Sequence, residues 1–185
     1  MIKTKSNYFV LTGAPGSGKS STLQTLKAFG HRCIGEPARE ILAEQRAVRG
    51  TALPEHDKGR FTELLLDRSV ANFVAEEPST TPVFFDRGIV DVVGFAKLFA
   101  LDTVMFEQAA QNYRYNTTVF VFNPWREIYV TDEERKMGFD EATRFHEQLL
   151  ASYRHHGYRL VFVPQETVEK RARFVCDQIQ SLGDL

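Results

Sequence analysis

A segment near the start of the chain combines glycines with a lysine and a serine in a pattern that could hold phosphate. The residues Gly-Ala-Pro-Gly-Ser-Gly-Lys-Ser at positions 13–20 fit G-x-x-x-x-G-K-[ST] at every fixed position. Glycines allow backbone conformations in which successive N–H groups point inward and surround a phosphate. Lys19 would then reach the β- and γ-phosphates of a nucleoside triphosphate, and the Ser20 hydroxyl would ligate Mg²⁺.

The flanking residues supply the context that this pattern requires. Residues 8–12 form an apolar, strand-like run, and residues 19–29 place Leu23, Leu26 and Phe29 at helical spacing. A chance match is the alternative, but amino-acid frequencies predict one in only about several hundred chains of this length. We therefore expect the chain to bind ATP or GTP with Mg²⁺. The residues expected to contact the nucleotide are Gly13, Ala14, Pro15, Gly16, Ser17, Gly18, Lys19, Ser20 and Ser21.

An aspartate ends another strand-like run, Val83–Asp86, which is apolar up to its last residue. Nucleotide sites form outside the carboxyl ends of parallel strands, so Asp86 could hold the Mg²⁺ shell beside the loop. An aspartate that caps the next helix is the alternative. Arg87 follows directly and could bind an acceptor or a phosphate, because its guanidinium fork suits planar oxyanions. A structural arginine is the alternative there.

Glu36 closes a third strand-like run, residues 32–36, just before Pro37. A carboxylate at the same edge of the sheet could accept the proton of an attacking hydroxyl and orient that hydroxyl toward the γ-phosphate. Arg39, one helical turn later, would point in the same direction and contact the acceptor. A helix-capping glutamate with an exposed arginine is the alternative.

Residues 124–138 are polar and charged and follow a strand-like run. Three of their side chains, Arg126, Arg135 and Lys136, are cations, which a closing segment could bring to the transferred phosphoryl group. We expect a lid here, with Arg135 acting on the phosphoryl group and Arg126 contacting substrate. A solvated charged helix with i,i+4 pairs is the alternative.

Arg68 and Asn72 share one face of a predicted long helix with Phe61 and Leu65. Arg68 could therefore project into an acceptor pocket, although packing at the edge of the core explains the same spacing. The remaining candidate ligands have no metal-binding or redox spacing, and we interpret them as structural. They are His31, His56, His146, His155, His156, Cys33 and Cys176.

Length and composition limit the possible classes of protein. A chain of 185 residues with a 25% share of charged residues is typical of one globular domain. The formal net charge of −1 gives no overall electrostatic signal for nucleic acid, although a local basic patch remains possible. No apolar stretch has the length of a membrane span or of a signal peptide, so we expect a cytoplasmic protein.

Strand-like and helix-like segments alternate along the chain. Predicted strands cover residues 8–12, 32–36, 83–86, 117–122 and 158–163. Predicted helices cover residues 19–29, 38–49, 57–76, 90–100, 103–113, 139–156 and 167–182. Because the strands are almost continuously apolar, helices should cover both faces of the sheet. This order predicts an α/β fold of three layers with about five parallel strands.

Several of these motifs occur together in one order. The loop at 13–20, Glu-Pro-Ala-Arg-Glu at 36–40, the strand that ends in Asp-Arg-Gly at 86–88, and Thr-Asp-Glu-Glu-Arg at 131–135 resemble the AAA-like P-loop domain shared with the ribosylnicotinamide kinase part of NadR proteins. Residues 125–142 resemble bacterial stand-alone members of that group. The resemblance covers nearly the whole chain, and only the phosphate loop is specific by itself.

The resemblance implies a fold like that of nucleoside and nucleotide kinases, with strand order 2-3-1-4-5. It places Glu36 at the position of the kinases' catalytic carboxylate, Asp86 and Arg87 at their acidic–arginine pair, and Arg135 in their lid region. Asp-Arg-Gly departs from the commoner Glu/Asp-Arg-Ser of deoxynucleoside kinases, which leaves the acceptor open. The adenylyltransferase domain that accompanies the kinase in NadR is absent from this sequence.

The leading hypothesis is an ATP- and Mg²⁺-dependent kinase that phosphorylates a hydroxyl of a nucleoside-like small molecule. The alternatives are a nucleotide-binding regulatory protein, in which a protein partner is possible, and a simple NTPase without a small-molecule acceptor.

Overall fold

The computed structural model describes residues 1–75, 80–129 and 137–183, and the statements below concern these residues. Among them, no helix is both long and apolar enough to cross a membrane. Because residues 130–136 are not described, the predicted lid at residues 124–138 lies partly outside the described residues, and Arg135 and Lys136 lie outside them.

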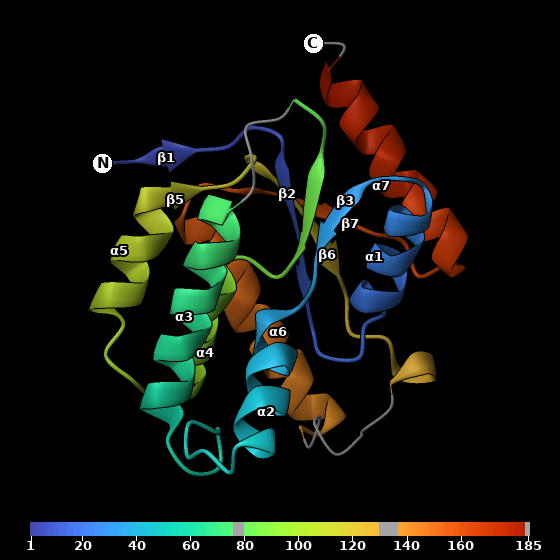
Figure 1. The fold of residues 1–185 in the computed structure, drawn as a ribbon. Coiled ribbons are helices and arrows are strands. Elements are labelled where there is room, and N and C mark those ends of the chain that lie inside the picture. Colours follow the sequence, from blue (N-terminus) through green and yellow to red (C-terminus); the bar gives the residue numbers. More distant parts are fainter. Residues whose placement is uncertain (76–79, 130–136, 184–185) are drawn as a thin grey trace.

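The centre of the molecule is a parallel five-stranded sheet (Figure 1). Its strands are β2 (Tyr8–Gly13), β3 (Arg32–Ile34), β4 (Val83–Asp86), β6 (Thr118–Phe122) and β7 (Arg159–Phe162). They lie in the order β3-β4-β2-β6-β7. Numbered in chain order, these five strands run 2-3-1-4-5, which is the order that the resemblance implied.

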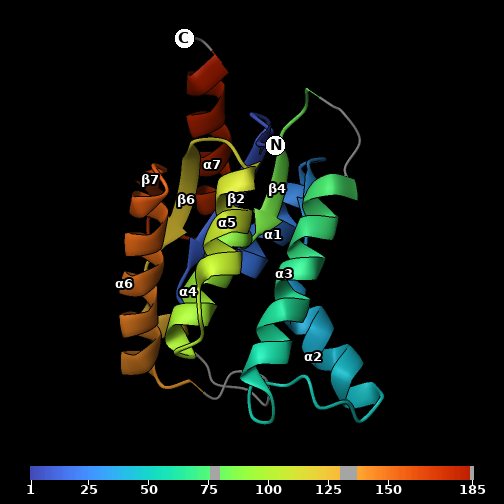
Figure 2. The same cartoon turned by 90° about the vertical axis from the view of Figure 1, so that its left-hand side faces the viewer.

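Helices cover both faces of this sheet, which confirms the predicted three-layer α/β class. They are α1 (Lys19–Ala28), α2 (Pro37–Ala47), α3 (Lys58–Ala75), α4 (Ile89–Leu98), α5 (Val104–Asn112), α6 (Phe139–His155) and α7 (Val168–Gly183), with a short 3₁₀ turn η1 at Arg126–Ile128. Figures 1 and 2 show α1 and α7 on one side of the sheet and α3, α4, α5 and α6 on the other.

Alternate residues of β2 point into the two cores that these layers form. Tyr8 and Val10 pack with residues of α2 to α6, whereas Phe9 and Leu11 pack with Leu26 of α1 and with α7. A strand buried on both faces cannot place a polar side chain on either side at low cost, which explains its uninterrupted apolar run.

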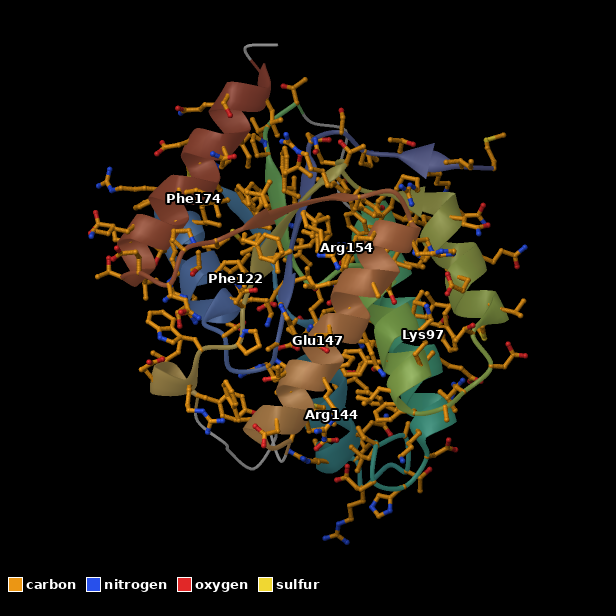
Figure 3. The ribbon with its side chains drawn as sticks, turned by 180° about the vertical axis from the view of Figure 1, so that it is seen from behind. Lys97, Phe122, Arg144, Glu147, Arg154 and Phe174 are labelled. Carbon is orange, nitrogen blue, oxygen red and sulfur yellow. The ribbon has the colours of Figure 1, made fainter. Side chains whose placement is uncertain are left out.

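The outer helices are amphipathic. On α6, the charged residues Arg144, Glu147 and Arg154 are exposed, whereas Phe145 and Leu149 are buried beside α4. Figure 3 shows the three charged residues along α6 from behind, together with Phe174 on α7. This division of the surface matches the helical period of the sequence.

The observed elements mostly end one or two residues before the predicted ends. The strand predicted at 32–36 is one of these, since it ends at Ile34. Glu36 is the N-cap of α2 and Pro37 is its first residue, because a proline cannot donate to a strand ladder but suits the first helical turn. A two-stranded parallel sheet, β1 (Lys3–Thr4) with β5 (Tyr113–Arg114), was not predicted.

The contact between α4 and α6 depends on a glycine. A Cβ added at Gly94 would lie 2.4 Å from Cδ2 of Leu149, a fully buried side chain of α6. We expect Gly94→Val to lower the free energy of unfolding by roughly 1–3 kcal/mol, measured by urea denaturation, because it overpacks this contact.

The control is Gly138→Val, since a Cβ at Gly138 meets nothing within 4 Å. Leu149→Ala in the Gly94→Val background should recover part of the lost free energy of unfolding, because the smaller side chain makes room for the valine. Equal stabilities for the two valine variants would contradict the close approach of α4 and α6.

Candidate functional site

The predicted phosphate loop connects the end of β2 to the start of α1. Gly13 has φ +135°, and a Cβ there would lie 2.1 Å from the carbonyl oxygen of Phe122 on the neighbouring strand. Gly18, the N-cap of α1, has φ +85°. These two positions need glycine, and the loop they allow sits at the positive end of the α1 dipole, where anions bind.

Lys19 is buried within this loop, with 4% of its surface exposed. Its ammonium donates hydrogen bonds to the carbonyl oxygens of Ala14 (2.8 Å) and Gly13 (3.3 Å). Burial, and after it the charge of Arg87, lowers the pKa of Lys19 to about 8. A buried cation held among carbonyl groups gains from a nearby anion, and a triphosphate would supply one.

Asp86 lies beside the loop at the end of β4. The register pairs Leu11 of β2 with Asp86, and the Ser20 hydroxyl donates to Asp86 Oδ2 at 2.8 Å. Asp86 Oδ1 is buried and has no hydrogen-bond partner among the residues that the structure describes. Burial, followed by the charge of Glu36, raises the pKa of Asp86.

The donor set formed by Ser20 and Asp86 fits Mg²⁺. Mg²⁺ prefers oxygen ligands and is commonly held by one or two protein groups together with substrate phosphates and water. The Ser20 hydroxyl, the Asp86 carboxylate and the unpartnered Oδ1 match that chemistry. Among the described residues, no group of three or more His, Cys, Asp or Glu side chains offers a different metal site.

Glu36 and Arg87 form a buried ion pair opposite the loop. Arg87 Nε donates to Glu36 Oε1 at 2.8 Å, and Arg39 Nε donates to Glu36 Oε2 at 3.1 Å. Burial opposes ionisation of Glu36, but the charges of Arg87 and Lys19 outweigh it and lower the pKa of this carboxyl. Glu36 is therefore an ionised carboxylate that accepts hydrogen bonds.

A second carboxylate, Asp91 on α4, holds the other side of Arg87. Asp91 is 1% exposed, and Arg87 NH1 donates to its Oδ1 at 3.1 Å. Asp91 also accepts from the hydroxyls of Thr12 and Tyr153 and from the N–H of Gly88. Burial raises the pKa of Tyr153 well above its ordinary value, so its hydroxyl remains a donor.

These bonds fix an unusual backbone at the end of β4. Arg87 has φ +74°, a region that costs a residue with a side chain on the order of 1 kcal/mol or more. Gly88 is enclosed, because a Cβ there would lie 2.9 Å from Cγ2 of Val10 and 3.2 Å from the Tyr153 hydroxyl. The network around Asp91 thus holds Arg87 in place and points its side chain at Glu36 and at the carbonyl of Gly13.

The last helix also reaches the phosphate loop. Arg171 of α7 is 4% exposed, and its NH1 donates to the carbonyl of Gly18 at 3.1 Å. Its guanidinium lies 5.6 Å from the centre of the Trp125 ring. Sequence reasoning missed Arg171 and Tyr153, because each acts through a contact between elements distant in sequence. It also missed Asp91, whose pairing with Arg87 is local.

One cavity of about 730 Å³ joins these groups. The phosphate loop lines one part of it, and Glu36, Arg39 and Arg87 line the adjoining part. Beyond them the wall is largely apolar and is formed by Leu42, Phe61, Phe95, Leu98 and Phe99. The arrangement can hold a polyphosphate beside a second molecule that has a flat apolar part.

Two predicted substrate contacts lie elsewhere. Arg68 does not line the cavity, because its guanidinium pairs with Glu44 at 2.8 Å and Glu40 at 3.0 Å on α2. Arg126 lies over the Phe139 ring at 4.1 Å and is also outside the lining. This geometry does not support acceptor contacts for either. Arg135, predicted to act on the phosphoryl group, lies outside the described residues.

Removing the Tyr153 hydroxyl tests the network around Asp91. We expect Tyr153→Phe to lower the free energy of unfolding by about 1–3 kcal/mol, because Asp91 loses a buried donor. Asp91→Asn should cost more, about 3 kcal/mol or above, because it weakens the compensation of the buried Arg87 charge. Tyr113→Phe is the control for urea denaturation, since the Tyr113 hydroxyl makes no hydrogen bond to a described residue. An equal loss of stability in the two tyrosine variants would show that the hydrogen bond from Tyr153 to Asp91 does not stabilise the fold.

His146 provides a pH test of burial beside the site. His146 is 4% exposed, and its Nε2 lies 3.2 Å from Asn123 Oδ1. Burial, followed by the positive charges of Lys19 and Arg87, lowers the pKa of His146 to about 4. Between about pH 6.5 and 4 the unfolded chain binds a proton here that the folded chain does not, so stability falls as pH falls, by roughly 2–3 kcal/mol.

The measurement is urea denaturation across that range. His146→Gln should flatten the pH dependence of stability, and His155→Gln, at an exposed position of the same helix, is the control. A His146→Gln profile as steep as that of the unsubstituted protein would exclude this source of pH dependence.

Comparison with solved structures shows which fold the chain shares. NadR in complex with NR has a TM-score of 0.69 and 20% identity, over 95% of this chain and 50% of the NadR chain. Thymidylate kinase from Ehrlichia chaffeensis has a TM-score of 0.60 and 18% identity, over 95% and 98% of the two chains. Deoxyadenosine kinase from M. mycoides with bound dATP has a TM-score of 0.65 and 12% identity, over 94% and 99%.

This chain therefore spans about half the length of the NadR chains that it matches, and nearly the full length of the two kinases. At these identities the likeness shows a shared P-loop fold of the nucleoside and nucleotide kinase type. No curated protein sequence matches the chain significantly.

A sequence model of one protein family matches most of the chain. The match covers residues 8–171, from the first strand of the central sheet to the arginine of α7 that contacts the phosphate loop. The chain belongs to the AAA domain family described by this model.

Proposed function

We propose that this protein is a Mg²⁺-dependent small-molecule kinase that transfers the γ-phosphoryl group of ATP, or of GTP, to a hydroxyl of a nucleoside-like acceptor. The observation that carries the proposal is the single cavity that is lined both by the phosphate loop and by Glu36, Arg39 and Arg87. A protein that only binds or hydrolyses a triphosphate has no need of a second compartment with apolar walls beside the γ-phosphate. The likeness in fold to thymidylate kinase, deoxyadenosine kinase and NadR supports the same class.

In the proposed reaction the acceptor oxygen attacks the γ-phosphorus while the bond to the β–γ bridging oxygen breaks. ADP leaves with the electron pair of that bond, and the hydroxyl proton passes from the acceptor to Glu36 or to water. Ser20 and Asp86 would hold Mg²⁺, which when bound neutralises charge on the β- and γ-phosphates. Lys19 and the backbone N–H groups of residues 16–18 would bind the phosphates, whose charge spreads over oxygens in the transition state.

The electrostatics of Glu36 refine the role expected from the sequence. Its lowered pKa makes it a weak base, so its main contribution would be to accept a hydrogen bond from the hydroxyl and orient the oxygen. Phosphoryl transfer passes through a loose transition state that needs little proton abstraction at its start. Arg87, held by Asp91, would keep Glu36 in position and contribute positive charge beside the transferring group.

The test is a screen of nucleosides with radiolabelled ATP and Mg²⁺, followed by Glu36→Gln. We expect labelled product with at least one nucleoside, and a fall in kcat of about 10²-fold or more in Glu36→Gln at unchanged nucleotide affinity. Lys19→Ala is the contrasting variant, which should lose nucleotide affinity itself.

The outcome also separates the rival functions. Release of ADP that no nucleoside accelerates, with no labelled acceptor, would show a simple NTPase or a nucleotide-dependent regulatory protein. Full turnover in Glu36→Gln would remove the orienting role while leaving the kinase assignment in place.

A further inference from the structure

Helix α2 presents a distinct stripe of side chains to the cavity. Arg39, Leu42 and Arg46 line it, at spacings of three and four residues that place them on one helical face. Arg39 pairs with Glu36 at the reactive end. Arg46 lies two helical turns away at the far end of the stripe, and Leu42 separates the two cations.

Helix α3 repeats this arrangement from the opposite wall. Lys58 and Phe61 are three residues apart and both line the cavity. Lys58 is the first residue of α3, whose first turn carries no acidic residue. A cation at the positive end of a helix is electrostatically unfavourable, so this position raises the local positive potential.

Arg46 and Lys58 have no ion pair within the part of the chain that the structure describes. Lys58 Nζ lies 5.5 Å from the centre of the Phe99 ring, another wall residue. Some other exposed cations are paired, such as Arg60 with Glu63 at 2.9 Å and Arg173 with Glu169 at 2.7 Å. What sets Arg46 and Lys58 apart is that both also line the cavity. Two unpaired cations at one end of a cavity create a preference for an anion there.

The distance between the two ends suits a nucleoside-sized molecule. Seven residues separate Arg39 from Arg46, which corresponds to about 10 Å along a helix that rises about 1.5 Å per residue. An acceptor whose hydroxyl lies at Glu36 would place its ring against Phe61, Phe95 and Phe99. A substituent on the far side of that ring would then meet Arg46 and Lys58.

One carboxylate, Glu55, also lines this end of the cavity and partly offsets the two cations. It makes no ion pair with a described residue, so it neutralises neither Arg46 nor Lys58 directly. Two cations and one carboxylate leave a charge of +1 at this end.

We propose that the acceptor carries an anionic group, a carboxylate or a phosphate ester, at the end opposite its reacting hydroxyl, and that Arg46 and Lys58 bind this group. The inference rests on the proposed kinase function and narrows its substrate class. Arg46 is suited to a forked contact with such an oxyanion, and Lys58 acts as a point charge.

Matched pairs of acceptors test this. Nicotinate riboside carries a ring carboxylate where nicotinamide riboside carries a carboxamide, and 5-carboxyuridine carries a ring carboxylate where uridine carries hydrogen. 5-Hydroxymethyluridine and its phosphate ester on the 5-hydroxymethyl group differ by a phosphate ester on the base. With ATP and Mg²⁺ at low ionic strength, we expect kcat/KM to be at least 10-fold higher for the anionic member of at least one pair, and the preference to shrink as salt is added. The pair that shows the preference distinguishes the two anion chemistries.

Variants that remove charges test whether Arg46 and Lys58 cause the preference for the anionic acceptor. Arg46→Gln with Lys58→Gln should reduce the anionic preference to less than 3-fold, whereas Glu55→Gln should increase it. Arg60→Gln is the control, since Arg60 lies two residues after Lys58 but does not line the cavity. Thermal melting checks that each variant folds, and Lys58→Gln alone replaces the double variant if that one is unstable.

Three results would overturn the inference, or the function on which it rests. Equal kcat/KM for both members of every pair, or a higher kcat/KM for the members without the carboxylate or phosphate ester, would reject the anion site while leaving the kinase function intact. An equal effect of the double variant on both members would assign Arg46 and Lys58 a role unrelated to the anion. Absence of phosphorylation of every acceptor, with ADP released regardless, would instead reject the kinase function on which the inference depends.

Discussion

The site depends on one chain of buried charges, in which Arg87 lies between the carboxylates of Glu36 and Asp91. Each of the three is nearly or largely shielded from water, and none could remain ionised there alone. The pairing has a structural consequence as well, because it connects the start of α2, the end of β4 and the first turn of α4. The two walls of the cavity are thereby fixed relative to the phosphate loop, whose Gly13 carbonyl also accepts from Arg87.

The fold could be predicted from the sequence because its signals are local. The glycine-rich loop, the apolar run at Val83–Asp86 and the helical spacing of Leu23 and Leu26 each depend on neighbours within one turn or one strand. The small sheet formed by β1 and β5 escaped prediction because each strand has only two residues and its partner lies more than 100 positions away. Strand β3 was predicted two residues too long, because Gly35 and Glu36 were assigned to the strand, whereas Glu36 is the N-cap of α2.

The site could be predicted only in part, because some of its residues are placed by strand topology and others by packing between elements. Lys19, Ser20, Glu36, Asp86 and Arg87 lie at strand ends or in the loop, where topology alone brings them together. For Arg68 the sequence left two roles open, because helical spacing identifies a face of the helix but not the residues that this face contacts, which here are two glutamates of α2. Asp91 did leave a signal, since it is the one carboxylate in the apolar run Ile-Val-Asp-Val-Val-Gly-Phe of α4. A lone charge in such a run indicates a buried partner. Arg171 left none, because its contact with the loop depends on how α7 packs against α1.

The enclosure of Gly88 links two positions that are 65 residues apart in sequence. A Cβ at position 88 would crowd Val10, Tyr115 and the Tyr153 hydroxyl, and that hydroxyl also donates to Asp91. A serine at position 88, as in the Asp-Arg-Ser of deoxynucleoside kinases, would therefore require these three side chains to shift. Position 88 should covary with these neighbours among relatives, with glycine where the tyrosine of α6 is kept. The glycine in the Asp-Arg-Gly of this chain would then reflect the packing that holds Arg87 in place, and not the identity of the acceptor.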